Sequence, residues 1–401
     1  MPTSSSTRRV FRAGPTDMRL LSVGATRLQT RLAGFYFFYY ATVGAFLPYW
    51  APYLAARGFS AEQMGIAFAL MGVMRSIVPI AWGTWSDRSG HRIVLIRGAA
   101  LAALAMFLAI PFVDGVLRIG LLMVGYTVFW HALLPQFEVV ALNHLRVKGG
   151  DYSRVRLWGS VGFVIAVLGL GFALDLTGIL WLPWLVGIFW LGMAASAWSV
   201  PEPPSTLTPG AVRNSIWSTL RQPQVLVFLG ICFASQLSFA PYYNFFTLFL
   251  ERHAYSRSAA GLLWSLGVVA EIGLFMVAGR LIGQFGARRL LVIVLFCTAI
   301  RWGVTAAAVD SWVLLLFAQL SHAITFGAYH AIAVHYVQQL FPADLQGRGQ
   351  AVYNAVAYGV GGSVGSLLAG YAWEGISPES VFYGAALVAL AGWLLAWRHL
   401  R

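Results

Sequence analysis

The chain has little charge for its length and almost no cysteine. Only 10% of its 401 residues are Asp, Glu, Lys or Arg, whereas 59% are hydrophobic. A water-soluble domain carries about 25% charged residues, so the composition excludes an ordinary soluble protein. The two cysteines, Cys232 and Cys297, both lie in apolar runs. They indicate no disulfide framework, and we interpret both as small packing residues.

Motifs of catalytic chemistry are also missing. The sequence contains no nucleophile elbow, no paired intramembrane aspartates and no zinc motif. We therefore expect no enzymatic activity, no metal site and no cofactor. The N-terminus has no short apolar core followed by a small-residue cleavage site, which argues against a secretory signal.

Long apolar runs are what the sequence does contain. About 20 apolar residues cross the hydrocarbon core as a helix, and these runs lack the alternation of a transmembrane barrel. We predict an all-α membrane protein with twelve transmembrane helices in two six-helix pseudo-symmetric halves. The expected spans are 32–54, 62–82, 93–112, 117–141, 156–174, 179–199, 224–250, 259–279, 290–308, 311–337, 349–370 and 380–397.

The net charge of +13 is distributed unevenly along the chain. Of the 27 Lys and Arg residues, 21 lie in the termini and the loops after even-numbered spans, and only four lie in the loops after odd-numbered spans. The positive-inside rule then places both termini in the cytoplasm. We expect a multi-pass protein of the cytoplasmic (inner) membrane. Because the charge follows membrane topology, we expect lipid around the protein and no nucleic-acid partner.

The two halves of the chain repeat each other at an offset of 196 residues. The matching pairs are Ser60 with Ser256, Gly65 with Gly261, Gly83 with Gly279, Gly90 with Gly286, and Arg92 with Arg288. We predict a disordered cytoplasmic tail at 1–30, an N-terminal half at 31–199, a cytoplasmic linker at 200–222 and a C-terminal half at 223–401. Such repeats occur in transporters whose two lobes rock around a midplane site.

Ionisable side chains inside the apolar runs mark the expected site. A charge at the bilayer centre costs about 2.5–3.5 kcal/mol on insertion scales, so such groups face the protein interior. Glu271 is the expected proton carrier, because burial and a nearby cation shift a carboxyl pKa in opposite directions. Arg301 can hold Glu271 or a substrate carboxylate, and His322 and His330 can relay a proton. The plainer alternatives are a static ion pair and two packing histidines.

A second set of residues is expected to face the substrate. Arg75 has no acid in its own helix, and Glu138 and Arg156 flank a turn where they form a gate, a substrate contact or a structural ion pair. Aromatic and amide side chains complete a cavity suited to an aromatic ring, unless they serve packing alone. The predicted substrate-binding residues are Arg75, Glu138, Arg156, Tyr39, Phe163, Trp264 and Asn354.

Several segments carry a family resemblance. The turn GTWSDRSGHR (83–92) resembles the loop signature of the major facilitator superfamily. The segments DYSRVRLWGSVGF (151–163), GLLWSLGVVAEI (261–272), AIRWG (299–303) and SHAITFGAYH (321–330) look like the phenylpropionate permease family. The chain is similar, more distantly, to the lactose permease-like proton symporters. It departs from them at Thr325, where they have an acid, and at Phe163, where they have Trp.

The resemblance implies a major facilitator that imports a small organic solute with a proton. It favours an aromatic carboxylate, such as a phenylpropionate-like acid. A proton-coupled sugar or nucleoside symporter and an efflux antiporter are the alternatives. The resemblance also implies a conformational latch at the 83–92 turn, formed by Asp87, Arg88, Gly83, Gly90 and Arg92. We expect a monomer whose ligands are this solute and protons.

Overall fold

The computed structural model describes residues 15–203 and 215–400. All regular elements in these ranges are helical, which confirms the predicted all-α fold class. The first group comprises α1 (Pro15–Phe46), α2 (Trp50–Ala56), α3 (Ala61–Ser89), α4 (Arg92–Ala109), η1 (Ile110–Phe112), α5 (Val116–Lys148), α6 (Tyr152–Thr177), η2 (Ile179–Trp181) and α7 (Leu182–Ser199). After α8 (Ile216–Leu220), the second comprises α9 (Pro223–Arg252), α10 (Arg257–Phe285), α11 (Ala287–Ala307), α12 (Trp312–Leu320), η3 (Ala323–Ala328), α13 (Tyr329–Leu340), α14 (Gln346–Asn354), η4 (Ala355–Gly361), α15 (Gly362–Gly375) and α16 (Pro378–His399).

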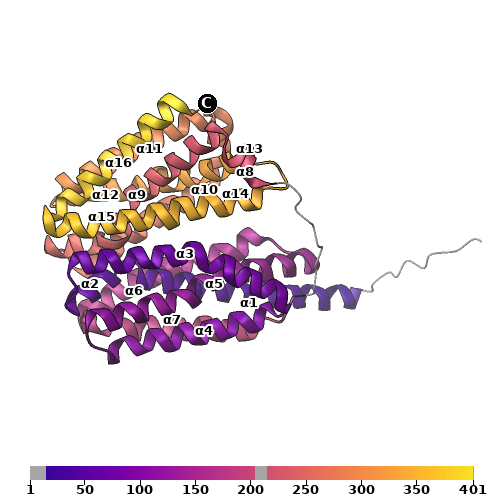
Figure 1. Ribbon diagram of the computed structural model, residues 1–401. Helices are drawn as coiled ribbons and strands as arrows, with labels where there is room; N and C mark the ends of the chain where they lie inside the picture. The colour runs from indigo at the N-terminus through magenta and orange to yellow at the C-terminus, as the bar shows by residue number, and fades with distance from the viewer. Residues whose placement is uncertain (1–14, 204–214, 401) are drawn as a thin grey trace, which may run out of the picture.

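The two groups of helices lie side by side as two halves (Figure 1). The start of α1, the short helix α8 and the end of α16 lie toward one end of the molecule, which we call the terminal end (Figure 1). At the opposite end, the N-termini of α3 and α10 meet the C-termini of α15 and α6. We call this the closed end.

Ten helices in the described ranges are long and apolar enough to cross a membrane. The two other predicted spans are 32–54, which is divided between α1 and α2, and 349–370, which is divided among α14, η4 and α15. In both cases, the shorter helices together cover the residues of the predicted span. The count of twelve spans stays a prediction.

The first helix begins earlier than the sequence indicated. We expected a disordered tail at 1–30, but α1 starts at Pro15 and runs unbroken to Phe46. The segment from 15 to 31 contains three Leu and three Arg residues, which favour helix, and proline is tolerated in a first turn. Residues 1–14 of the expected tail, and residues 204–214 of the expected linker, lie outside the described ranges.

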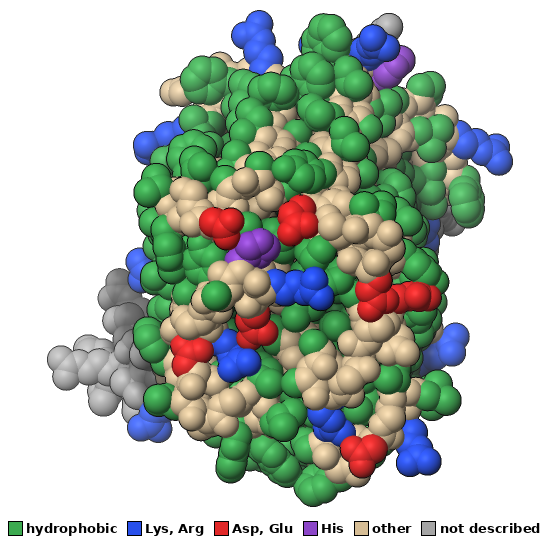
Figure 2. Space-filling model, turned by 90° about the vertical axis from the view of Figure 1, so that its left-hand side faces the viewer, with side chains coloured by type: hydrophobic (Ala, Val, Ile, Leu, Met, Phe, Trp, Pro, Cys, Tyr) green, Lys and Arg blue, Asp and Glu red, His purple; other side chains and the backbone are tan. Residues whose placement is uncertain are grey.

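The most extensive contacts between the halves are made by two helix pairs, α3 with α15 and α6 with α10. Glycines allow close backbone approach in both pairs. A Cβ atom on Gly65 would lie 2.8 Å from the Ser366 carbonyl oxygen, and one on Gly261 would lie 2.8 Å from the Val167 carbonyl oxygen. Figure 2 views the closed end, where acidic and basic side chains gather across the middle of the face.

The repeat found in the sequence corresponds to shared helix starts. Ser60 caps α3 by accepting a hydrogen bond from the Gln63 amide, and Ser256 caps α10 by accepting one from the Ala259 amide. These are ordinary N-caps, in which a side-chain oxygen satisfies an otherwise unpaired helix N–H. The same residue therefore starts the second long helix of each half.

Candidate functional site

A hydrogen-bonded chain of three side chains lies inside the second half. The Arg301 guanidinium in α11 donates from Nη1 to Nδ1 of His322, 2.9 Å away. The other ring nitrogen of His322, Nε2, lies 3.3 Å from Oε2 of Glu271 in α10. Three of the four residues predicted for proton coupling are thus brought together, with His322 between the cation and the carboxylate.

This geometry determines which nitrogen of neutral His322 carries the proton. A guanidinium has donors only, so Nδ1 must accept its hydrogen bond and Nε2 must carry the hydrogen. That Nε2–H faces the Glu271 carboxylate. The Glu271 side chain is 16% exposed and that of His322 is 6% exposed. Glu271 is therefore the more accessible of these two proton-binding groups.

Arg301 is held without a direct ion pair to any carboxylate in residues 15–203 and 215–400. Its Nη1 also donates to Oγ1 of Thr325 over 3.0 Å, and its Nη2 donates to Oε1 of Gln319 over 3.4 Å. The guanidinium carbon lies 4.5 Å from the ring centres of both Tyr242 and Trp302. Such cation–π contacts are worth up to about 2 kcal/mol each when desolvated, and they offset part of the cost of burying this charge.

Glycines bring α10 close enough to η3 for this chain to form. A Cβ on Gly327 would lie 3.1 Å from Cγ of Glu271, and one on Gly267 would lie 3.2 Å from Cβ of His322. The η3 segment that follows His322 is a π-helix, which often occurs at functional sites. Larger side chains at either glycine would therefore push the carboxylate and the imidazole apart.

His330 lies apart from the three-residue chain but on the same side of its helix. The Phe326 ring stacks between the two imidazoles, 5.2 Å from His322 and 6.1 Å from His330 between ring centres. Nδ1 of His330 lies 3.2 Å from the Tyr358 hydroxyl in η4. The Arg75 guanidinium of α3 stands 4.8 Å from the centre of that tyrosine ring. Arg75 and His330 thus share Tyr358 at the boundary between the halves.

The predicted pair of Glu138 and Arg156 is held by tyrosines. Arg156 donates a hydrogen bond to the Tyr40 hydroxyl and lies 4.0 Å from the centre of the same ring. Glu138 accepts a hydrogen bond from the Tyr152 hydroxyl over 3.4 Å. No direct ion pair between Glu138 and Arg156 occurs in the described part of the chain. Both charges nevertheless lie on adjoining helices, α5 and α6.

The sequence also matches known proteins over most of its length. A sequence model of the MFS_1 like family matches residues 29–384. This chain belongs to the major facilitator superfamily. It is 32% identical to the probable 3-phenylpropionic acid transporter of Escherichia coli (strain K12) over 372 residues, which cover 90% of this chain and 95% of that protein. The family resemblance drawn from the sequence is therefore confirmed.

Two further relatives support the assignment. The chain is 27% identical to the maltose permease of Geobacillus stearothermophilus, with 93% of this chain and 94% of that protein covered. A crystal structure of the nucleoside transporter NupG matches the fold with a TM-score of 0.80 at 14% identity, covering 92% of this chain and 99% of that chain. The protein is a multi-pass membrane transporter.

The residues predicted for the latch gather at one turn of the transporter. Asp87 in the last turn of α3 pairs with Arg92 in the first turn of α4, and Arg92 also donates to Gln136 in α5. Gly90 ends α3 with φ of 71°, a conformation that favours glycine. Arg88 is exposed, and a Cβ on Gly83 would approach Gln136 within 3.7 Å. All contacts of Asp87 shown here stay within the first half.

The other predicted substrate residues differ in accessibility. Tyr39, Phe163 and Trp264 are buried in the transporter, and Trp264 stacks on Tyr242 with 4.4 Å between ring centres. Asn354 is exposed at the end of α14. The structure therefore favours packing for the first three and leaves Asn354 accessible. The roles predicted for all four stay predictions.

Sequence reasoning missed Gln319, Tyr242 and the contact role of Thr325. The Tyr242 hydroxyl donates to Oε1 of Gln319 over 3.0 Å, and that oxygen also accepts from Arg301. A buried glutamine three residues before His322 was a usable signal, because an amide inside an apolar span requires partners. The tyrosine gave no comparable signal, since aromatic residues are common throughout this sequence.

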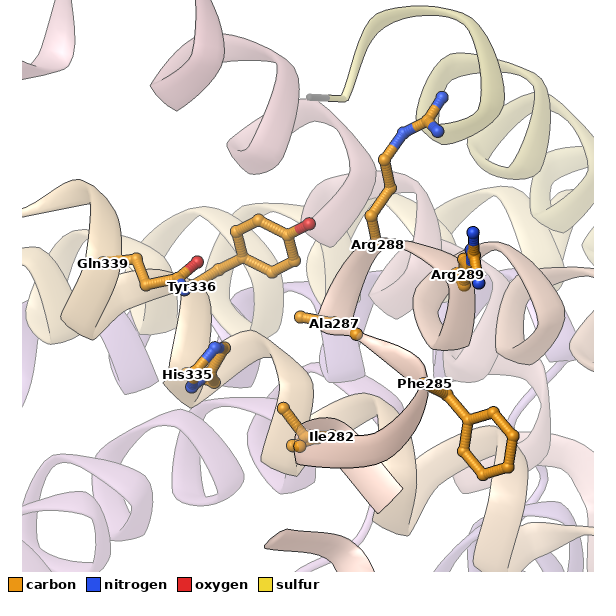
Figure 3. A pocket seen from close by; sticks show the side chains of 10 residues that line it. Ile282, Phe285, Ala287, Arg288, Arg289, His335, Tyr336 and Gln339 are labelled. Atoms are coloured by element: carbon orange, nitrogen blue, oxygen red, sulfur yellow. The ribbon is translucent and has the colours of Figure 1, made fainter. Parts of the chain in front are cut away.

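A cavity of about 540 Å³ lies at the terminal end of the second half, at the turn between α10 and α11 (Figure 3). Its wall includes Gly283, the position that the repeat aligns with Asp87. Arg288 points away from it toward α16 and donates to the Trp397 carbonyl over 2.8 Å. None of the predicted substrate or proton residues lines this cavity. Within the described residues, no group of three or more His, Cys, Asp and Glu side chains could hold a metal ion.

Proposed function

We propose that this transporter imports a small aromatic carboxylate together with a proton. The observation that carries the proposal is that Arg75 is exposed and forms no ion pair within the described residues. Its side chain is exposed at the boundary between the halves, over the ring of Tyr358. Among residues 15–203 and 215–400, no ion pair joins this guanidinium to a carboxylate. A planar cation with unused donors is suited to bidentate binding of a substrate carboxylate.

The charges of the predicted site support an anionic substrate. Glu271 balances Arg301 through His322, and Glu138 lies on the helix next to Arg156. Counted together, the predicted site residues include three guanidinium groups, of Arg75, Arg156 and Arg301, and two carboxylates, of Glu138 and Glu271, which leaves one positive charge in excess. Concentrated positive charge in a cleft of low dielectric attracts anions. Tyr358 supplies aromatic surface next to Arg75, and Phe326 stacks on His330, which contacts the same tyrosine.

Glu271 is the proposed proton carrier. It is the most exposed member of its chain and accepts the His322 Nε2–H while ionised. Protonation would remove its negative charge and weaken that hydrogen bond, which is stronger to a carboxylate than to a neutral acid. The loss would leave the buried Arg301 charge less compensated. Proton binding and rearrangement of the site are thus coupled through one hydrogen-bonded chain.

The relatives support the proposed substrate class, and the charge distribution supports the proposed orientation in the membrane. The E. coli protein that is 32% identical carries the name probable 3-phenylpropionic acid transporter. The basic turns after α3, α5 and α10 lie on the side of the termini in the chain's topology. Under the positive-inside rule this terminal end faces the cytoplasm, with both chain termini there, in the inner membrane. We propose that the protein acts as a monomer.

A neutral solute is the second candidate, because the Glu271–His322–Arg301 chain is already balanced in charge. Relatives named maltose permease and nucleoside transporter NupG fit that reading. A sugar or nucleoside would leave Arg75 as a hydrogen-bond donor to hydroxyl or carbonyl oxygens. The two candidates therefore differ in the charge that the substrate presents to this arginine.

Competition in proteoliposomes distinguishes the candidates. Entry of radiolabelled 3-phenylpropionate is measured with an inward proton gradient, in the presence of excess benzoate-type acids, their amides, maltose or nucleosides. We expect only the aromatic acids to compete, and the amides to fail. Competition by maltose or nucleosides, without any by the acids, would contradict the proposal. Saturable entry that is absent from protein-free liposomes is required in either case.

A further inference from the structure

The closed end contains two carboxylates that reach across the boundary between the halves. In one place, Asp175 near the C-terminus of α6 accepts hydrogen bonds from the backbone amides of Arg257 and Ser258, over 2.9 and 3.1 Å. Those amides belong to the first turn of α10, in the other half. The Arg257 side chain also donates to the Leu174 carbonyl of α6 over 3.3 Å.

The second place has the same construction with the halves exchanged. Glu374 near the C-terminus of α15 accepts a hydrogen bond from the backbone amide of Ala61 over 2.9 Å. Ala61 is the first residue of α3, in the first half. Here too, the carboxylate of one half sits at the N-terminus of the second long helix of the other half.

These two places correspond residue by residue under the internal repeat. Ala61 and Gly65 fall on Arg257 and Gly261 at an offset of 196. Gly171 and Asp175 of α6 fall on Gly370 and Glu374 of α15 at an offset of 199. At each place the glycines allow contact: a Cβ on Gly171 would lie 2.8 Å from the Arg257 carbonyl oxygen, and one on Gly370 would lie 2.5 Å from the Ala61 carbonyl oxygen.

We propose that Asp175 and Glu374 are paired inter-half helix caps that hold the closed end shut and set how often it opens. The amides at a helix N-terminus lack partners within the helix, and the helix dipole adds positive potential there. A carboxylate from the other half accepts hydrogen bonds from these amides and balances the positive potential only while the halves touch. When the end opens, water replaces the carboxylate at the amides. Each cap therefore favours the closed arrangement and is lost in the open one.

The size of the effect follows from ordinary helix–charge interactions. Both carboxylates are exposed, so solvent screens them. A charge at a helix N-terminus at the surface shifts an equilibrium by about two- to fivefold. The two caps share no partner, so their effects should multiply to about four- to 25-fold. That is enough to change which side of a transporter is open without changing its fold.

Spin-label distance measurements test the proposal. Labels are placed at Leu117→Cys in α5 and Val313→Cys in α12, which are 76% and 75% exposed at the closed end, in a Cys232→Ala, Cys297→Ala background. Asp175→Asn and Glu374→Gln keep the side-chain shape and remove the charge. We expect each to raise the ratio of long to short distances by about two- to fivefold, and the double variant to combine both.

Two matched variants control for loss of negative charge on the same face. Asp114 pairs with Arg57 over 3.0 Å inside the first half, and Glu379 lies 3.9 Å from His253 inside the second. Asp114→Asn and Glu379→Gln should leave the distance distribution unchanged. A double cap variant that superimposes on the wild type, or controls that shift as far as the caps, would overturn the proposal. Equal thermal stability of all variants excludes misfolding as the cause of any shift.

Discussion

Replacing Arg75 should weaken transport of carboxylates and spare transport of neutral analogues. The variant Arg75→Gln keeps a side chain that can donate hydrogen bonds but removes the positive charge. The arginine has no carboxylate of its own within residues 15–203 and 215–400. Removing it therefore leaves no protein anion unpaired, and the loss should concern the substrate.

The expected magnitude follows from the bond that is lost. A hydrogen bond to a charged group contributes about 1.5–3 kcal/mol, which corresponds to about a 10- to 150-fold rise in KM for the carboxylate. The contact of Arg75 with Tyr358 is lost as well, and such cation–π contacts contribute about 0.5–1 kcal/mol when solvent reaches them. This second loss should affect all substrates alike. The carboxylate-specific part is therefore the ratio between an acid and its amide.

The assay compares initial rates of proteoliposome uptake for 3-phenylpropionate and 3-phenylpropionamide in wild type, Arg75→Gln, Arg75→Lys and Tyr358→Phe. Arg75→Lys should lose less than Arg75→Gln, because an ammonium keeps the charge but not the planar pair of donors. Tyr358→Phe keeps the ring under Arg75 and removes only the hydroxyl that contacts His330. Equal loss for acid and amide in Arg75→Gln would refute the assignment of Arg75 to the substrate carboxylate.

Three other substitutions give independent tests. Arg301→Lys should lower proton-coupled uptake by about tenfold or more, because one ammonium cannot reproduce the two-pronged guanidinium that holds His322 and Gln319. Uptake rates under a proton gradient measure this effect. An unchanged rate would contradict the role of Arg301 in proton coupling. Gly261→Leu should shift the spin-label distances at the closed end toward longer values, since its Cβ alone would lie 2.8 Å from a backbone oxygen; an unshifted distribution would show that the contact is not tight. Gly90→Ala should cost about 1–2 kcal/mol of stability because of its φ of 71°. Gly98→Ala, which meets no atom within 4 Å, should be neutral or stabilising in the same thermal melt, and equal effects would contradict the argument.

The sequence predicted the fold class because the physics of a bilayer is simple. Apolar runs of spanning length, broken by polar turns, permit only helices that cross the membrane. Helix starts were also predictable where a serine shared by the two repeats stands just before an apolar run, as at Ser60 and Ser256. The start of α1 was not, because residues 15–31 are polar enough to resemble a tail while their helix propensity is high.

The sequence indicated which residues belong to the candidate site, but it did not indicate which of them contact each other. Charges buried in apolar runs drew attention to Glu271, Arg301 and His322 without a structure. Which of them touch depends on how α10, α11 and η3 pack, and the sequence did not indicate the π-helix that begins directly after His322. The closed-end caps were harder still. Asp175 and Glu374 each lie beside a polar turn at the C-terminal end of an apolar run, and only the packing of the two halves gives them a shared role.

Proton entry that accompanies substrate entry tests the account most directly. Proteoliposomes that contain either the wild type or Glu271→Gln are loaded with a pH-sensitive dye, and 3-phenylpropionate is added outside. Protein-free liposomes measure the passive entry of the undissociated acid. The account predicts substrate-dependent acidification with wild type above the passive rate, and none above it with Glu271→Gln, which still exchanges labelled for unlabelled substrate. Equal acidification by both proteins would contradict Glu271 as the proton carrier, and no acidification above the passive rate by either would contradict proton-coupled import itself.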